Sequence, residues 1–252
     1  MVRGAGHFSA RRWFRSDAPI FFEMEGSSND VDIASSRDSV RIGSALVGRF
    51  DEGDHWSLRF SHEEANAIVR VDPGGPNPPM ATGIVAGGQW TVTSPIANGR
   101  THGWFNAGRR GGIFEGRAVA LHRGGDGRPP AARKTVVILG SDVSIGFDWQ
   151  GTDRLGWARI GDNDLSLETT NVAVRTDGSA TIDFRPAVDL VVSVAPGKVG
   201  GTTETLDHLT GPERWLARMT LGPSNRHVYR GQTRFSFEGR EHRAAAVTVI
   251  VD

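Results

Sequence analysis

The strongest candidates for acid–base chemistry lie in one stretch, residues 101–125, which reads THGWFNAGRRGGIFEGRAVALHRGG. Its Gly-rich centre predicts a hairpin turn between two strands. His102 and Trp104 are two residues apart and so share a face of the first strand, while His122 lies on the second. An imidazole changes charge near neutral pH and can donate or accept a proton. We interpret the hairpin as an interior wall facing a ligand, with structural or surface histidines as the alternative.

Carboxylates offer a second kind of proton donor or acceptor. Glu23 and Glu25 are two residues apart in the segment IFFEMEG, so a strand there places both on one face. Two neighbouring carboxylates can serve as acid and base when their surroundings differ. The alternative interpretation is a pair of solvated charges at the edge of a sheet.

Asp148 stands between Phe147 and Trp149 in the segment IGFDWQ. In a strand, the two aromatic residues share an apolar face with Ile145, and Asp148 points the opposite way with Gly146. If that second face lies inside the protein, Asp148 is a candidate general acid or base. If it lies outside, Asp148 is a surface charge.

Several kinds of chemistry are excluded by what the sequence lacks. The chain has no cysteine, which rules out thiolate catalysis, thiolate metal sites and disulfides. The segments HEEAN at 62–66 and GDNDLSLE at 161–168 lack the ligand spacing of zinc and calcium sites. No phosphate loop, dinucleotide fingerprint or nucleophile elbow stands between a strand and a helix. We therefore expect neither a metal nor a cofactor.

The charge balance limits the partners. The 29 Lys and Arg residues equal the 29 Asp and Glu residues in number, so no net field attracts nucleic acid or an anionic membrane. No apolar run approaches the ~18 residues of a membrane span, and the N-terminal residues lack a signal-peptide core. We expect a cytoplasmic protein with a small-molecule partner, and the sequence leaves its oligomeric state open.

The elements that must hold these residues are strands, because nearly every apolar run alternates. The clearest example is VAVRTDGSATIDF, residues 172–184, in which a Thr-Asp-Gly-Ser turn joins two alternating segments. An all-β chain of this length predicts a large antiparallel β-barrel or sandwich, with two stacked β halves as a variant. The one helical pattern covers residues 204–219.

The domain prediction follows the breaks in this pattern. Residues 1–18 are polar and aperiodic and are expected to form an N-terminal arm, followed by a single β domain over 19–252. The Gly- and Pro-rich run at 124–133 cannot continue a strand or a helix. Two halves, 19–123 and 134–252, joined by that linker are the alternative.

The placement of glycine, aromatic residues and histidine between His102 and His122 resembles the lipocalin-like halves of carotenoid hydratases and related decalin-forming cyclases. The resemblance covers that segment alone and assigns no catalytic residue. It implies that the expected barrel or sandwich is lipocalin-like.

These observations favour a cofactor-independent enzyme of specialised metabolism with an enclosed apolar cavity. Its substrate would be a hydrophobic small molecule that undergoes cyclisation, isomerisation, hydration or dehydration by positioning and acid–base catalysis. A non-catalytic carbohydrate- or lipid-binding module is the alternative, as is a polysaccharide lyase or hydrolase on a jelly roll that uses Tyr229, the single tyrosine. The residues expected to take part in the first case are His102 and His122 as proton donor or acceptor, Glu23 or Asp148 as partner, and Trp104 and Trp149 as cavity walls.

Overall fold

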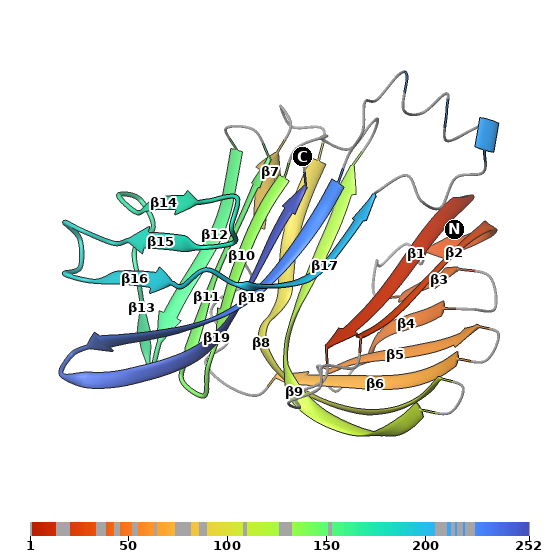
Figure 1. Ribbon diagram of the computed structural model, residues 1–252, viewed down its shortest axis with the longest axis horizontal. Coiled ribbons are helices and arrows are strands. Elements are labelled where there is room, and N and C mark those ends of the chain that lie inside the picture. Colours follow the sequence, from red (N-terminus) through yellow and green to blue (C-terminus); the bar gives the residue numbers. More distant parts are fainter. Residues whose placement is uncertain are drawn as a thin grey trace. The chain divides into compact units, whose positions relative to one another are not determined.

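Figure 1 shows a computed structural model of the chain. It describes residues 2–13, 21–33, 39–42, 46–51, 55–62, 65–73, 82–85, 90–107, 110–125, 133–150, 153–204 and 225–251, with positions 211, 212, 215 and 219. These residues are almost all in antiparallel strands, which confirms the all-β prediction. The chain divides into two compact units: unit 1 comprises Met1–Pro73 and Arg100–Gly116, and unit 2 comprises Gly74–Gly99 and Arg117–Asp252.

Unit 1 begins as a meander in which each strand pairs with the next. Its strands are β1 (Val2–Trp13), β2 (Phe21–Ile33), β3 (Ser39–Ile42), β4 (Leu46–Asp51), β5 (His55–His62) and β6 (Ala65–Pro73). The order continues from β6 to β8 (Trp90–Ala107), which pairs with β9 (Arg110–Gly125). The residues expected to form an N-terminal arm include β1, which pairs with β2 along its length.

Unit 2 is built on a seven-stranded sheet with the order β13-β12-β11-β10-β19-β18-β17. The strands of this sheet are β10 (Arg133–Leu139), β11 (Val143–Gln150), β12 (Asp153–Ile160), β13 (Asn163–Asp164), β17 (Lys198–Glu204), β18 (Asn225–Phe237) and β19 (Arg240–Val251). A three-stranded sheet consists of β14 (Asn171–Val174), β15 (Ala180–Asp183) and β16 (Val191–Val194). Unit 2 also contains β7 (Thr82–Val85).

The hydrophobic core of unit 2 is shared by these two sheets. Ile145 and Phe147 of β11 belong to the same buried cluster as Ile182 and Phe184 of the β15 segment, and all four are 0% exposed. Each such burial stabilises the fold by about 1.5–3 kcal/mol. Apolar burial between the sheets is therefore a large part of what holds the sandwich together.

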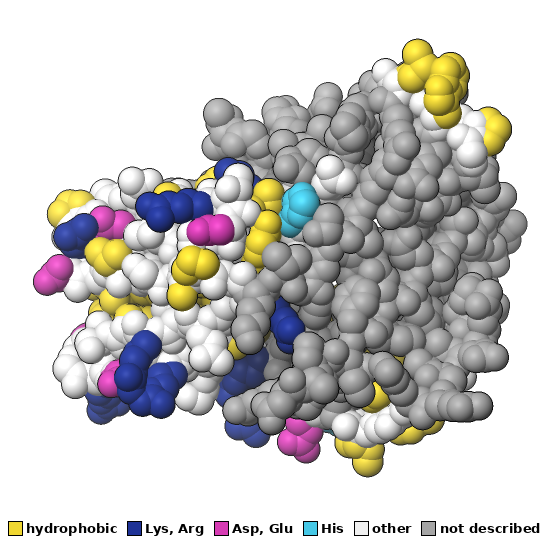
Figure 2. Space-filling model, in the orientation of Figure 1, with side chains coloured by type: hydrophobic (Ala, Val, Ile, Leu, Met, Phe, Trp, Pro, Cys, Tyr) yellow, Lys and Arg dark blue, Asp and Glu magenta, His cyan; other side chains and the backbone are white. Residues whose placement is uncertain are grey.

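The exposed positions of this sandwich carry charges of both signs. Arg185 donates to Asp183 through Nε and Nη2, at 2.9 and 2.7 Å, and these hydrogen bonds lower the pKa of Asp183 to about 2. Arg234 pairs with Glu241 on the neighbouring strand. Figure 2 shows basic and acidic side chains interspersed over this part of the protein. The mixture agrees with the formal net charge of zero.

The hairpin predicted over residues 172–184 is present. Val172 pairs with Ile182 and Val174 with Ala180, and all four side chains belong to the core or pack against it. The turn requires glycine at position 178, where φ is +80°. The turn also packs against Tyr229, whose Oη donates to the Thr176 carbonyl at 2.7 Å. The single tyrosine thus supports the fold of unit 2.

We expect Gly178→Ala to destabilise unit 2 strongly. A Cβ at this position would lie 2.3 Å from Cγ of Tyr229, and the positive φ adds a strain of roughly 1–3 kcal/mol. Gly239→Ala is the matched control, because Gly239 also has a positive φ, +73°, but a Cβ there meets nothing within 4 Å. Urea unfolding should give a clearly larger loss for Gly178→Ala. Equal losses would mean that the contact with Tyr229 is unimportant.

The helical segment lies in the second half of the predicted span. Glu204 is the last residue of β17, and Gly211, Pro212, Trp215 and Met219 have helical backbone. The other positions between 205 and 218 are outside the described residues. Within the part of the chain that the structure describes, no helix has the length and apolar character needed to cross a membrane.

The long strands β8 and β9 contribute residues to both units. β8 enters unit 1 at Arg100, and β9 leaves it after Gly116. Among the described strands neither sheet closes, because β1 and β7 end one strand order and β13 and β17 end the other. The expected linker at 124–133 begins within the end of β9, and the proposed division into halves there stays a prediction.

Candidate functional site

The central sheet of unit 2 has a second buried face opposite the sandwich core. Along β11 the residues Ile145 and Phe147 belong to the core, whereas Ser144, Gly146 and Asp148 point the other way, and all five are buried. The predicted alternation in this segment is confirmed. The interpretation of Asp148 as a surface charge is wrong, because covering strands leave it 0% exposed.

Asp148 is held by a threonine on the neighbouring strand. Thr135 of β10 stands directly opposite it in the antiparallel register and is 6% exposed. The Thr135 hydroxyl donates to Oδ1 of Asp148 at 2.5 Å. A carboxyl group shielded from bulk water is thereby fixed in its orientation, as a positioned proton donor or acceptor must be.

An indole covers the space between Ser144 and Asp148 on β11. Trp157 of β12 pairs with Gly146, and a Cβ on that glycine would lie 2.1 Å from the Trp157 ring, so only glycine admits the indole here. Trp157 donates from Nε1 to Oγ of Ser144 at 3.1 Å, and Ser144 donates to the Ala97 carbonyl at 2.7 Å. These two hydrogen bonds connect β12 to β11 and β11 to β8.

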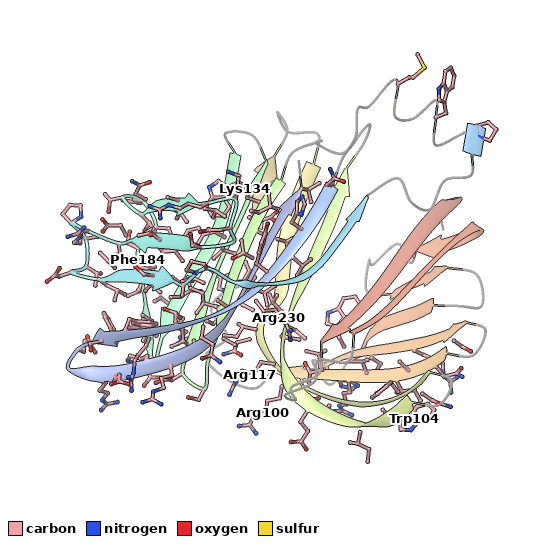
Figure 3. All side chains as sticks on the ribbon, in the orientation of Figure 1. Arg100, Trp104, Arg117, Lys134, Phe184 and Arg230 are labelled. Atoms are coloured by element: carbon pink, nitrogen blue, oxygen red, sulfur yellow. The ribbon has the colours of Figure 1, made fainter. Side chains whose placement is uncertain are left out.

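This face is covered by residues of β7, β8 and β9 that belong to unit 2. Ala97 clusters with Val137 and Trp157, and Val119 packs against the same cluster. Asn98, fully buried, donates to the carbonyls of Gly140 and Val143 at 3.3 Å each. Figure 3 shows Phe184 on the β14–β16 side of the central sheet and Arg117 on the other side.

Arg117 brings a positive charge to the same layer. Its Nη1 donates to Oδ1 of Asn98 at 2.9 Å. Six buried or partly buried residues on this side form hydrogen bonds through their side chains. We call this group the polar interlayer: Asn98, Arg117, Thr135, Ser144, Asp148 and Trp157. Both faces of β11 are thus buried: one face is apolar, and the other adjoins a layer that carries a carboxyl group, hydroxyls, an indole and a guanidinium group.

We expect Asn98→Ala to lower the stability of unit 2 by about 1–3 kcal/mol. The substitution removes three hydrogen bonds and leaves the buried Gly140 carbonyl without that donor. Asn171→Ala, at an exposed position of β14, is the control and should change stability little. Urea unfolding followed by tryptophan fluorescence measures both. Equal stability of Asn98→Ala and the wild type would show that Asn98 does not anchor β8.

His102 lies on an exposed surface of unit 1. Its side chain is 54% exposed, and its Nδ1 lies 3.5 Å from Oδ2 of Asp72. Trp104, two residues along β8, is 43% exposed. The structure therefore places the predicted His102 and Trp104 pair on one face, as expected, and that face contacts solvent.

The other predicted site residues fall in different places. Glu23 lies on β2 opposite Arg11, and its side chain is outside those described, as is that of His122 on β9. His102 and Glu23 belong to unit 1, whereas His122 and Asp148 belong to unit 2. Trp149 is half-buried and packs against the sandwich core, with its ring 5.8 Å from that of Phe147. Of the predicted residues whose side chains the structure describes, Asp148 alone lies in the polar interlayer.

Sequence reasoning missed five members of the polar interlayer. Thr135 and Ser144 sit in strands whose apolar neighbours dominate the pattern, so nothing marked them as partners of Asp148 or Trp157. The alternation of β11 was the available signal, because it puts Ser144 on the same face as Asp148. Among the described residues no three His, Asp or Glu side chains gather as metal ligands.

Comparison with known proteins shows a shared fold. The structure is similar to the crystal structure of CghA with Sch210972, with 8% identity, a TM-score of 0.59, and coverage of 92% of this chain and 76% of that chain. CghA in a second crystal structure gives 9% identity, a TM-score of 0.58 and the same coverage. A putative AttH from Nitrosomonas europaea gives 8% identity, a TM-score of 0.50, and coverage of 90% and 76%. No protein-family model and no curated protein matches the sequence.

Proposed function

We propose that this protein is a cofactor-independent enzyme that binds a hydrophobic small molecule at the polar interlayer of unit 2. The reaction is a cyclisation, isomerisation, hydration or dehydration that needs substrate positioning and one acid or base. The observation that carries the proposal is Asp148, a completely buried carboxyl group whose orientation is fixed by Thr135.

The environment of Asp148 supports proton transfer. Water is excluded from the group, and exclusion of water strengthens electrostatic interactions and suppresses side reactions. The Thr135 hydroxyl on the neighbouring strand sets the orientation of this carboxyl group.

The other members of the polar interlayer suit an apolar ligand with one polar group. The Trp157 indole, 3% exposed, forms an apolar wall of this layer, and its Nε1 donor is already occupied by Ser144. Arg117 adds a positive charge that can stabilise negative charge on a carbonyl or enolate oxygen. The roles expected are proton transfer for Asp148, positioning for Thr135 and apolar contact for Trp157.

The similarity of the fold to a solved structure that contains a ligand also supports the proposal. CghA, with the same fold at 8% identity, was crystallised with the small molecule Sch210972. We infer from this that the fold can accommodate a small organic ligand. The roles of His102 and His122 as additional proton donors or acceptors stay predictions. The enclosed cavity also stays a prediction.

The test is a search for conversion in a solvent extract of the cells that produce the protein. The extract is incubated with wild-type protein and analysed by liquid chromatography with mass spectrometry, and native mass spectrometry identifies any retained compound. The proposal predicts a retained hydrophobic compound and a product of equal mass, or one that differs by a single water. Retention without any conversion would refute the catalytic part, and neither retention nor conversion would refute the whole proposal.

A further inference from the structure

A second group of functional side chains lies on the exposed face of unit 1, apart from the residues of the polar interlayer. Along β8, His102, Trp104 and Asn106 are exposed, whereas Phe105 between them is 5% exposed. Alternate residues of a strand point to opposite faces, so the three exposed residues share the outer face of this sheet. Figure 3 labels Trp104 beside β6 and β9.

Strand β6 supplies charged groups to the same face. Arg70 donates from Nε to Oδ1 of Asp72 at 2.7 Å, and Oδ2 of Asp72 lies 3.5 Å from Nδ1 of His102. Asp72 thus contacts both Arg70 and His102, one through each carboxylate oxygen. The contact uses one of the five guanidinium N–H donors of Arg70 and one of the two ring nitrogens of His102.

Strand β9 places an apolar side chain next to the indole. A Cβ on Gly111 would lie 3.4 Å from Oδ1 of Asn106, which sets these two residues opposite each other in the hairpin. Two residues further along each arm, Trp104 stands opposite Ile113, which is 84% exposed. Ile68 of β6, 49% exposed, lies two residues before Arg70 and shares its face. Among the described side chains, the patch therefore combines one partly exposed indole, two isoleucines and a row of polar groups.

From this juxtaposition we propose that the outer face of unit 1 binds the pyranose ring of a carbohydrate, with Trp104 as the stacking surface and Arg70, Asp72 and His102 as hydrogen-bonding groups. A pyranose presents C–H groups on one face and hydroxyls around its edge. The C–H face packs on a flat aromatic ring, while the hydroxyls pair with planar polar side chains. This patch offers both kinds of contact on adjacent strands.

Other occupants fit the patch less well. A stable contact with a second copy of the chain buries about 1,600 Å² in total, whereas a fully buried aromatic side chain contributes only ~150–250 Å². An anionic membrane would bind a mostly basic surface, whereas this face carries Asp72, paired with Arg70, as well as the exposed Arg59 and Arg100. Among the described side chains, one indole and two isoleucines beside polar groups of both charges match a sugar ring.

The test measures binding of hexasaccharides of glucose, mannose and N-acetylglucosamine to the full-length protein by calorimetry and by saturation-transfer NMR. We expect at least one to bind, and Trp104→Ala to weaken that binding roughly tenfold or more. Trp104→Phe should retain most of the affinity, because a smaller aromatic surface remains. Trp215→Ala is the matched control, since Trp215 is 63% exposed on the helical segment and should leave binding unchanged.

Several results would overturn this inference. Absence of binding by all three hexasaccharides at millimolar concentration would do so, as would equal affinity of Trp104→Ala and the wild type. Binding of anionic vesicles or self-association that depends on Trp104, without sugar binding, would assign the face to another partner. The inference is independent of the proposed enzyme, because Asp148→Asn should bind the same sugars with unchanged affinity.

Discussion

Replacement of Asp148 by asparagine is expected to slow conversion of the retained small molecule by roughly 100- to 10,000-fold, the usual contribution of a general acid or base. Asparagine has nearly the same shape, and its side-chain oxygen can still accept the hydrogen bond from Thr135. The variant should therefore stay folded and retain the ligand. The lost property is the ability to give or take a proton. Single-turnover assays of ligand-loaded protein measure the rate directly.

A matched control separates this effect from a general loss of charge. Asp162→Asn removes a carboxylate at an exposed position of the turn after β12, and we expect it to convert the ligand at the wild-type rate. Thr135→Val should give a smaller rate loss than Asp148→Asn, since it removes only the group that orients the carboxyl. A wild-type rate in Asp148→Asn would end the assignment of Asp148 as proton donor or acceptor.

The largest expected loss of stability follows from Phe147→Ala, at about 3–5 kcal/mol. Phe147 is 0% exposed at the centre of the sandwich core, and a Cβ on Gly156 would lie only 2.8 Å from its ring, so the neighbouring strand packs closely on it. Truncation leaves a cavity that a strand buried on both faces cannot easily fill. Since small proteins are stable by about 5–15 kcal/mol in total, unit 2 should unfold at much lower urea concentration.

Phe237→Ala provides the comparison for this prediction. Phe237 is half-buried at the end of β18 and packs against the same core. Its truncation removes a side chain of the same size from a position that water can partly fill. The expected loss of unfolding free energy is therefore smaller than for Phe147→Ala. Equal losses of unfolding free energy in the two variants would contradict the placement of the core around Phe147.

The sequence was sufficient to predict the elements in which local pattern and tertiary packing agree. The hairpin over 172–184 has alternating apolar residues and an Asp-Gly turn, and both features match the sandwich core that it joins. The opposite orientation of Asp148 and Phe147 followed from strand geometry alone. The burial of Asp148 could not be predicted from its own strand. The second face of that sheet is covered by residues that are distant in the sequence, such as Ala97 and Val119.

The residues that contact the candidate residues could not be predicted from the sequence either. Thr135 meets Asp148 because β10 pairs with β11 in one register, and a shift by one residue would point Thr135 to the other face. His102 meets Asp72 because β6 adjoins β8 in the sheet, although β7 intervenes in the chain. Such contacts depend on strand order and register, which composition and periodicity do not specify.

A hydrophobic small molecule that reacts at the polar interlayer of unit 2 should be visible there when the reaction is blocked. The most direct test is a crystal structure of Asp148→Asn with the compound retained from the cell extract. We expect the ligand to contact the Trp157 ring and to place its reacting atom within hydrogen-bonding distance of the residue at position 148. A ligand bound only elsewhere, such as on the Trp104 face of unit 1, would contradict it.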